Sequence, residues 1–274
     1  MQYQTTIAKN ATYTGIGLHS GCEVTLTLKP APVNTGIVFV RVDLPGCPQV
    51  AAISDHITAT MRATTLEKGA AKVFTVEHLL AACSAMQLDN CYIEMNASEP
   101  PVADGSAIVF ASLITKAGII EQDVERKIIV IDQVYTVREE DKFITIIPYD
   151  GFRISFTSIN PHPMLGVQYC DVEVNPDSFT EQIAAARTIA FTKEIEALKK
   201  MGLGLGGSID NVIVYDEEKA LNPLRYKDEL VRHKVLDIIG DLSLAGNVHG
   251  HIIAVKSSHA LNTALARKIV GLAE

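Results

Sequence analysis

The stretches TVEHLLAACSAM (75–86) and DELVRHKVLDIIGDLSLAG (228–246) decide the fold, because the same order of elements follows each of them. Apolar residues recur at helical spacing in both stretches, and Thr75 is a typical N-cap for the first helix. Working outward, a strand pattern, a loop and a second helix pattern follow each stretch. They are a strand over 91–95 and a helix over 107–118 in the first half, and a strand over 251–255 and a helix over 260–271 in the second.

The two units have nearly equal lengths: His78 and Gly118 are 40 positions apart, and His233 and Gly271 are 38 apart. This near-equality predicts a duplicated unit of one sheet and two helices, not a solenoid of many short repeats. We therefore predict an α+β fold of two similar domains, 1–124 and 125–274, each a layered sheet with two helices, with the active site at the seam. Alternating apolar residues predict further strands at 24–30, 36–42, 127–137, 143–148 and 152–159.

The second domain carries additional sequence that predicts a βαβ insertion at about 172–215. Its expected elements are a strand at 172–174, a helix over 181–202 and a strand at 212–215. The glycine-rich stretch GLGLGGS (202–208) follows a helix and precedes a strand, which is the wrong order for a phosphate-binding loop. We interpret it as a helix C-cap and tight turn.

Composition restricts the function and the compartment. Hydrophobic residues make up 47% and charged residues 20% of 274 residues, which is typical of a globular protein. The net charge of −8 argues against nucleic-acid binding. Five scattered cysteines without a C-x-x-C pair indicate a reducing compartment, and no signal peptide or transmembrane run is evident. We expect a cytoplasmic protein.

His233 and Asp237 are spaced to share one face of a helix and so to reach a single ion. Such a pair alone is more often a surface pair. His78 occupies the matching position in the first unit, and two like units packed together would bring it to the same seam. Two histidines and one aspartate are a ligand set typical of catalytic zinc sites, which keep one position open. Glu77 is then a candidate general base, or alternatively a first-turn glutamate that complements the helix dipole.

An amide hydrolase also needs a group that protonates the leaving nitrogen. His259 precedes the last predicted helix, and imidazole titrates near neutrality, so it is a candidate acid. Asp241 lies one turn beyond Asp237, where it could orient His259 or hold its charge. Without these neighbours, His259 would be interpreted as an ordinary loop residue.

Together these residues resemble the UDP-3-O-acyl-N-acetylglucosamine deacetylase family, which catalyses the committed step of lipid A synthesis in Gram-negative bacteria. The resemblance spans the whole chain. Its strongest blocks are TGIGLHSG (14–21), TVEHLLAA (75–82), EPPVADGSA (99–107), ART (186–188), LGGSIDN (205–211), VRHKVLDIIGDL (231–242) and SSHALN (257–262).

The resemblance implies two α+β domains and zinc-dependent hydrolysis of the N-acetyl group of a UDP-linked acylated aminosugar. It implies roles for thirteen residues: zinc ligands His78, His233 and Asp237; base Glu77; acid His259 supported by Asp241; oxyanion donor Thr188; contacts to anionic or leaving parts of the substrate by Lys234 and Lys256; and an acyl passage around Leu18, Ile195, Gly204 and Val214. The last four are also what an ordinary core would contain.

The chain departs from well-known family members at four positions. Ser258 stands where many members have glycine, and Leu230 stands where many members have Glu-Pro before Val-Arg-His. Asn160 and Ile147 align with an aromatic residue and a lysine linked to the nucleotide. Two alternatives remain open: a zinc amidase for another acylated sugar or peptide, and a metal-free binding protein in which these side chains only pack. The ligand set suits Fe²⁺ as well as Zn²⁺. We expect a monomer.

Overall fold

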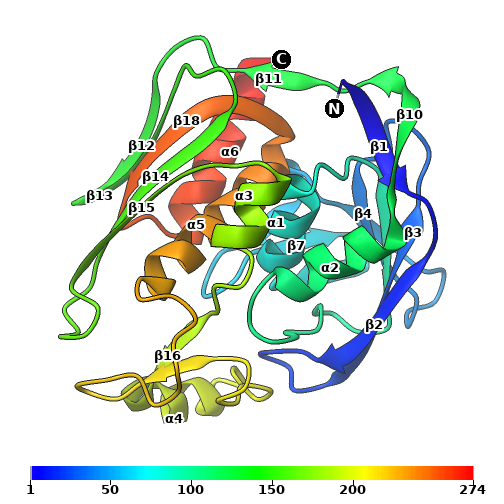
Figure 1. Ribbon diagram of the computed structural model, residues 1–274. Coiled ribbons are helices and arrows are strands. Elements are labelled where there is room, and N and C mark those ends of the chain that lie inside the picture. Colours follow the sequence, from blue (N-terminus) through cyan, green and yellow to red (C-terminus); the bar gives the residue numbers. More distant parts are fainter. Residues whose placement is uncertain (1, 274) are drawn as a thin grey trace.

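The computed structural model describes residues 2–273 and contains two main β-sheets with helices between them (Figure 1). The first sheet is built from the N-terminal half of the chain and the second from the C-terminal half. The strands of the first sheet, in spatial order, are β2 (Ala11–Ile16), β3 (Glu23–Pro30), β9 (Cys91–Met95), β4 (Ile37–Arg41) and β5 (Gln49–Ala51). Those of the second are β12 (Tyr135–Glu139), β13 (Lys142–Ile147), β18 (Asn247–Val255), β14 (Phe152–Ile159) and β15 (Val167–Glu173), with β11 (Ile128–Val130) also paired to β18.

The two sheets have the same pairing pattern. In the first, β2, β3 and β9 are antiparallel neighbours, β9 is parallel to β4, and β4 is antiparallel to β5. In the second, β12, β13 and β18 are antiparallel neighbours, β18 is parallel to β14, and β14 is antiparallel to β15. The predicted duplication of an α+β unit is therefore confirmed. The boundary between residues 124 and 125 stays a prediction.

Four helices fill the space between the sheets. They are α1 (Glu77–Ala85) and α2 (Ile108–Ala117) from the first half, and α5 (Glu229–Leu242) and α6 (His259–Ala273) from the second. Helix α1 packs on α2 and α5, and α5 packs on α6, so the first helix of each unit lies at the seam. None of the helices within residues 2–273 is both long and apolar enough to cross a membrane.

Alternation of apolar and polar residues explains the sheets. Val24, Leu26 and Leu28 of β3 are fully buried, while the residues between them are partly exposed. The strand over 91–95 alternates in the same way. One face of each strand thus joins the core, as the period of two requires.

Three smaller elements complete the fold. One small sheet pairs β1 (Tyr3–Ile7) with β10 (Ile119–Glu125), and another contains β6 (Ile57–Ala59), β7 (Thr65–Lys68) and β8 (Ala71–Phe74). The third is the insertion of the second half, which projects from the body (Figure 1) and comprises β16 (Ile189–Phe191), α4 (Thr192–Lys200) and β17 (Ile213–Tyr215). The two strands of this insertion are parallel, as a βαβ unit requires.

Several local predictions were wrong. The residues at 172–174 belong mostly to β15 of the main sheet, and the helix over 181–202 is two helices, α3 (Pro176–Gln182) and α4, separated by β16. Long-range hydrogen bonds interrupt the expected helix. The Thr188 amide donates to the Gly105 carbonyl, and the Thr188 carbonyl accepts from the Ile213 amide. The strand at 127–137 is likewise split into β11 and β12, because its two parts pair with different strands.

Thr75 does not cap α1. The N-cap of that helix is Val76, and no side chain makes a capping hydrogen bond to the first turn. Thr75 has a positive φ of 58°, and its hydroxyl donates to Glu99 Oε1 at 2.8 Å. This buried bond to a charged acceptor is the stronger of the two alternatives for the hydroxyl.

Candidate metal centre and active site

Close contact between α1 and α5 brings the two halves of the site together. A Cβ atom at Gly240 of α5 would lie 2.1 Å from the carbonyl oxygen of Glu77, the first residue of α1. Only glycine allows the backbones to approach so closely. The first turn of α1 therefore lies directly against α5.

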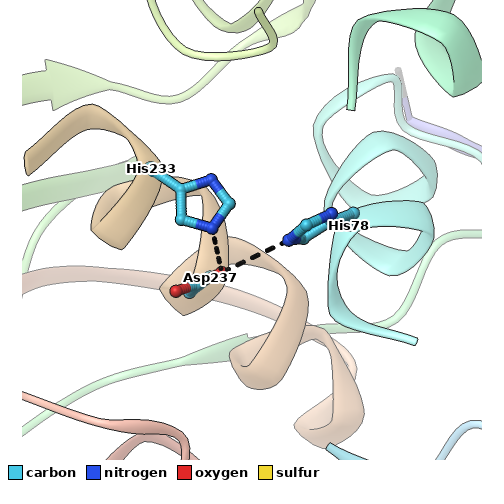
Figure 2. A group of neighbouring side chains, drawn as sticks. All are labelled: His78, His233 and Asp237. Atoms are coloured by element: carbon cyan, nitrogen blue, oxygen red, sulfur yellow. Dashed lines mark ion pairs between the residues drawn. The ribbon is translucent and has the colours of Figure 1, made fainter. Parts of the chain in front are cut away.

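The three side chains predicted to bind metal lie together at this contact. His78 projects from the first turn of α1, and His233 and Asp237 lie one turn apart on α5 (Figure 2). The Nε2 atoms of His78 and His233 lie 3.8 Å and 3.4 Å from Asp237 Oδ1. One ligand atom from each residue lies within 4.8 Å of the others, and all three side chains are buried.

The protonation states of the two imidazoles suit metal binding. The Ala186 carbonyl accepts a hydrogen bond of 3.1 Å from His233 Nδ1, so the proton is on Nδ1 and Nε2 carries a free lone pair. Burial lowers the pKa of His233, and burial together with the adjacent His233 lowers the pKa of His78 to about 3. Both rings are thus neutral at physiological pH, which is the form that binds metals.

The carboxylate of Asp237 is charged and incompletely bonded. Burial disfavours its charge, but nearby positive charge, chiefly that of Lys234, outweighs this effect and holds its pKa well below the usual range. Lys234 Nζ donates to Oδ2 at 2.8 Å, whereas Oδ1 is buried and has no hydrogen-bond partner among residues 2–273. An unbonded buried carboxylate oxygen is costly. A cation between Oδ1 and the two Nε2 atoms would satisfy it, so these residues fit a metal ion.

Glu77 directly precedes His78 in the sequence, and its buried carboxyl group has a shifted pKa. Burial, with smaller contributions from Asp241 and Asp237, raises its pKa to about 7. The backbone amide of Thr64 donates to Glu77 Oε2 at 3.0 Å. A carboxyl with a pKa near neutrality can accept and release a proton at physiological pH.

His259 and Asp241 form the contact expected from the sequence. His259 Nδ1 lies 2.8 Å from Asp241 Oδ2, and Asp241 is fully buried. Burial opposes a positive charge on His259, but Asp241 outweighs it and raises the pKa of the imidazole to about 10. The ring is therefore protonated at neutral pH and can donate a proton.

The other predicted residues lie at varied places. Thr188 follows the segment that bonds to His233, and its hydroxyl has no partner in the described chain.

Leu18 and Val214 are buried in a small apolar cluster against which Ile195 packs. The Gly204 amide donates to His19 Nδ1 at 3.2 Å. Lys256 pairs with Asp141 on the β12–β13 hairpin, and its substrate contact stays a prediction.

Three residues around the site were not found from the sequence. Thr64 donates its hydroxyl to Asp241 Oδ1 at 2.6 Å, and Asn262 donates to Asp241 Oδ2 at 2.9 Å. Gly240 permits the helix contact. A signal existed only for Gly240, because glycine is unfavourable inside a helix unless the backbone must be approached closely.

The site thus combines a buried His–His–Asp cluster with a protonated imidazole and a carboxyl group whose pKa is near neutrality. It lies at the seam of a duplicated α+β fold. This combination is typical of metal-dependent hydrolases. Comparison with known proteins specifies the family. Residues 4–271 match the profile of the family described as LpxC: UDP-3-O-acyl N-acetylglycosamine deacetylase, and the chain belongs to that family.

Similar proteins carry the same description. One from Hahella chejuensis (strain KCTC 2396), named UDP-3-O-acyl-N-acetylglucosamine deacetylase, is 48% identical over 262 residues, covering 94% of this chain and 87% of that protein. Proteins with the same name from Anaeromyxobacter sp. (strain Fw109-5) and Myxococcus xanthus (strain DK1622) are 47% and 46% identical over 270 residues. Each alignment covers 97% of this chain and 88% or 86% of the relative. The sequence similarity to these relatives thus extends along nearly the entire length of this chain.

Proposed function

We propose that this protein hydrolyses the N-acetyl group of UDP-3-O-acyl-N-acetylglucosamine, releasing acetate and the free amine, in lipid A biosynthesis. The observation that carries the proposal is the convergence of His78, His233 and Asp237 from two repeated units on one point. The names of the relatives supply the substrate.

We propose zinc as the metal, held by His78 Nε2, His233 Nε2 and Asp237 Oδ1, although iron would suit the same ligands. When bound, such an ion acts as a Lewis acid that polarises the amide carbonyl and makes water nucleophilic at neutral pH. Lys234 supports the ligand set without binding the ion, because it bonds to Asp237 Oδ2 and leaves Asp237 Oδ1 free for the ion.

In this proposal Glu77 is the general base. Its carboxylate removes a proton from the attacking water, and a pKa of about 7 keeps a large fraction of the group ionised at neutral pH. The Thr64 amide fixes one carboxylate oxygen, which leaves the other for water.

His259 is the proposed general acid. Because Asp241 holds Nδ1, the proton on Nε2 is available to the nitrogen of the amide as the C–N bond breaks. Thr188 is the proposed hydroxyl donor to the oxyanion, and Lys234 and Lys256 are proposed to meet charged parts of the substrate.

The acyl chain is proposed to lie along Leu18, Ile195 and Val214, near Gly204. Each CH₂ removed from water contributes about 0.8 kcal/mol, so an apolar passage can dominate the affinity. We further propose that the protein acts in the cytoplasm as a monomer, with the two predicted domains 1–124 and 125–274 on either side of the substrate.

The test is a deacetylation assay on UDP-3-O-acyl-N-acetylglucosamine with wild-type protein and Glu77→Gln. The substitution preserves shape and removes the base, so we expect activity to fall by about 10²- to 10⁴-fold at unchanged metal content. Full activity in the variant would exclude Glu77 as the base. Equal hydrolysis of a free acylated glucosamine would favour the alternative of a broader zinc amidase.

A further inference from the structure

Thr64 is a fully buried residue directly before β7, in the first half of the chain. Its backbone amide donates to Glu77 Oε2 at 3.0 Å, and its hydroxyl donates to Asp241 Oδ1 at 2.6 Å. One residue thus bonds to the carboxyl groups of both halves, the first on α1 and the second on α5.

The hydroxyl bond is the only one that Asp241 Oδ1 makes within residues 2–273. The other oxygen, Oδ2, accepts from His259 Nδ1 and from Asn262 Nδ2. Ser257 Oγ in turn donates to Asn262 Oδ1 at 2.6 Å. Because Asp241 is fully buried, loss of the Thr64 hydroxyl would leave a charged oxygen without a partner and release one end of the carboxylate.

We propose that Thr64 is a positioning residue that fixes the base and the acid of the reaction relative to each other. Its amide fixes the Glu77 carboxyl, and its hydroxyl fixes the Asp241 carboxylate and, through it, the orientation of the His259 ring. This inference rests on the proposed function of Glu77 and His259. Proton transfer depends on donors and acceptors held at hydrogen-bond distance, so loosening this link slows the chemical step rather than substrate binding.

Thr64→Val and Thr64→Ser form a matched pair, because valine preserves the shape and serine preserves the hydroxyl. In the metal-loaded protein we expect kcat of Thr64→Val to fall about 10- to 100-fold with KM within about two-fold of wild type. Thr64→Ser should retain most of the activity. Thr64→Ala provides a second variant without the hydroxyl if valine prevents folding.

A double-mutant cycle separates positioning from a general structural effect. If the hydroxyl acts through Asp241, then Thr64→Val combined with Asp241→Asn should be no slower than Asp241→Asn alone. Losses that multiply would overturn the proposal, as would wild-type kcat in both Thr64→Val and Thr64→Ala.

A readout independent of activity is the His259 Nδ1 proton in NMR spectra, assigned by its loss in His259→Gln. We expect slow solvent exchange in wild type and Thr64→Ser and faster exchange in Thr64→Val; unchanged exchange would contradict the proposed link. Failure of the proposed function is distinguishable, because wild-type protein would then not deacetylate the substrate at all.

Discussion

Gly240 of α5 lies against the carbonyl oxygen of Glu77, so closely that a methyl group at position 240 would come within 2.1 Å of it. The next residue along α1 is His78, and Asp237 lies one turn before Gly240. The helix contact and the metal cluster are therefore a single structural unit, because the backbone approach sets the distance between ligands from the two repeats.

Substitution Gly240→Ala should damage both stability and metal binding. The added carbon forces α1 and α5 apart, and overpacking of this kind costs about 1–3 kcal/mol in the free energy of unfolding. We expect weaker metal affinity as well, measured by competition with a chromophoric chelator. Urea denaturation gives the stability.

Gly271 provides the control, because it is exposed on α6 and an added Cβ would meet no atom within 4 Å. Gly271→Ala should leave metal affinity unchanged and, by helix propensity, increase stability by up to about 1 kcal/mol. Equal behaviour of the two variants would show that the close approach at Gly240 is unimportant.

Glu229 and Arg187 form a buried ion pair, and removing one of its two charges should strongly destabilise the protein. Arg187 Nε lies 2.9 Å from Glu229 Oε1, and both side chains are almost inaccessible. Glu229→Gln would leave the guanidinium without its counter-charge, and we expect a loss of about 3–5 kcal/mol in the free energy of unfolding.

The exposed pair Lys72–Glu67 is the comparison for that measurement. Because solvent screens it, Glu67→Gln should change the free energy of unfolding by about 1 kcal/mol or less. If both substitutions had equally small effects, the buried charge of Arg187 would not depend on Glu229 for its compensation.

Stability should depend on pH through His259. Its pKa is raised from 6.5 to about 10 in the folded protein, chiefly because Asp241 outweighs the effect of burial. A raised folded-state pKa gives stabilisation that is complete below pH 6.5 and is lost as the pH rises through about 10.

In metal-free protein, the stability difference between wild type and Asp241→Asn should therefore shrink between about pH 6 and about pH 10. Urea denaturation at several pH values measures it, and an NMR titration of the imidazole checks the pKa directly. A difference that stays constant over this range would contradict the assigned charge on His259.

Much of the fold could be predicted because local periodicity and tertiary burial agree. The strands at 91–95 and 152–159 match the structure residue for residue, since one face of each enters the core. Helical spacing placed His233 and Asp237 on one helix face, but the pair became a predicted ligand set only through the matching position of His78 in the first unit. His78 required the recognition of a repeated unit, because nothing near it in sequence marks it as a ligand.

The remainder depended on long-range contacts that leave no local pattern. The helix expected over 181–202 is interrupted where Thr188 bonds to Gly105. Thr64 lies outside any periodic segment, and its two partners are 13 and 177 positions away. Tertiary bonds of this kind override local propensity.

The central claim is that residues from both repeats share one ion, and metal analysis of purified variants tests it most directly. Wild-type protein and the control His251→Gln, whose imidazole bonds to Ser155 on the second sheet, should contain about one zinc or iron ion per chain. His78→Gln, His233→Gln and Asp237→Asn should each retain the fold by circular dichroism and lose most of the metal. Stoichiometric metal in all three variants, or none in the metal-replete wild type, would contradict the account.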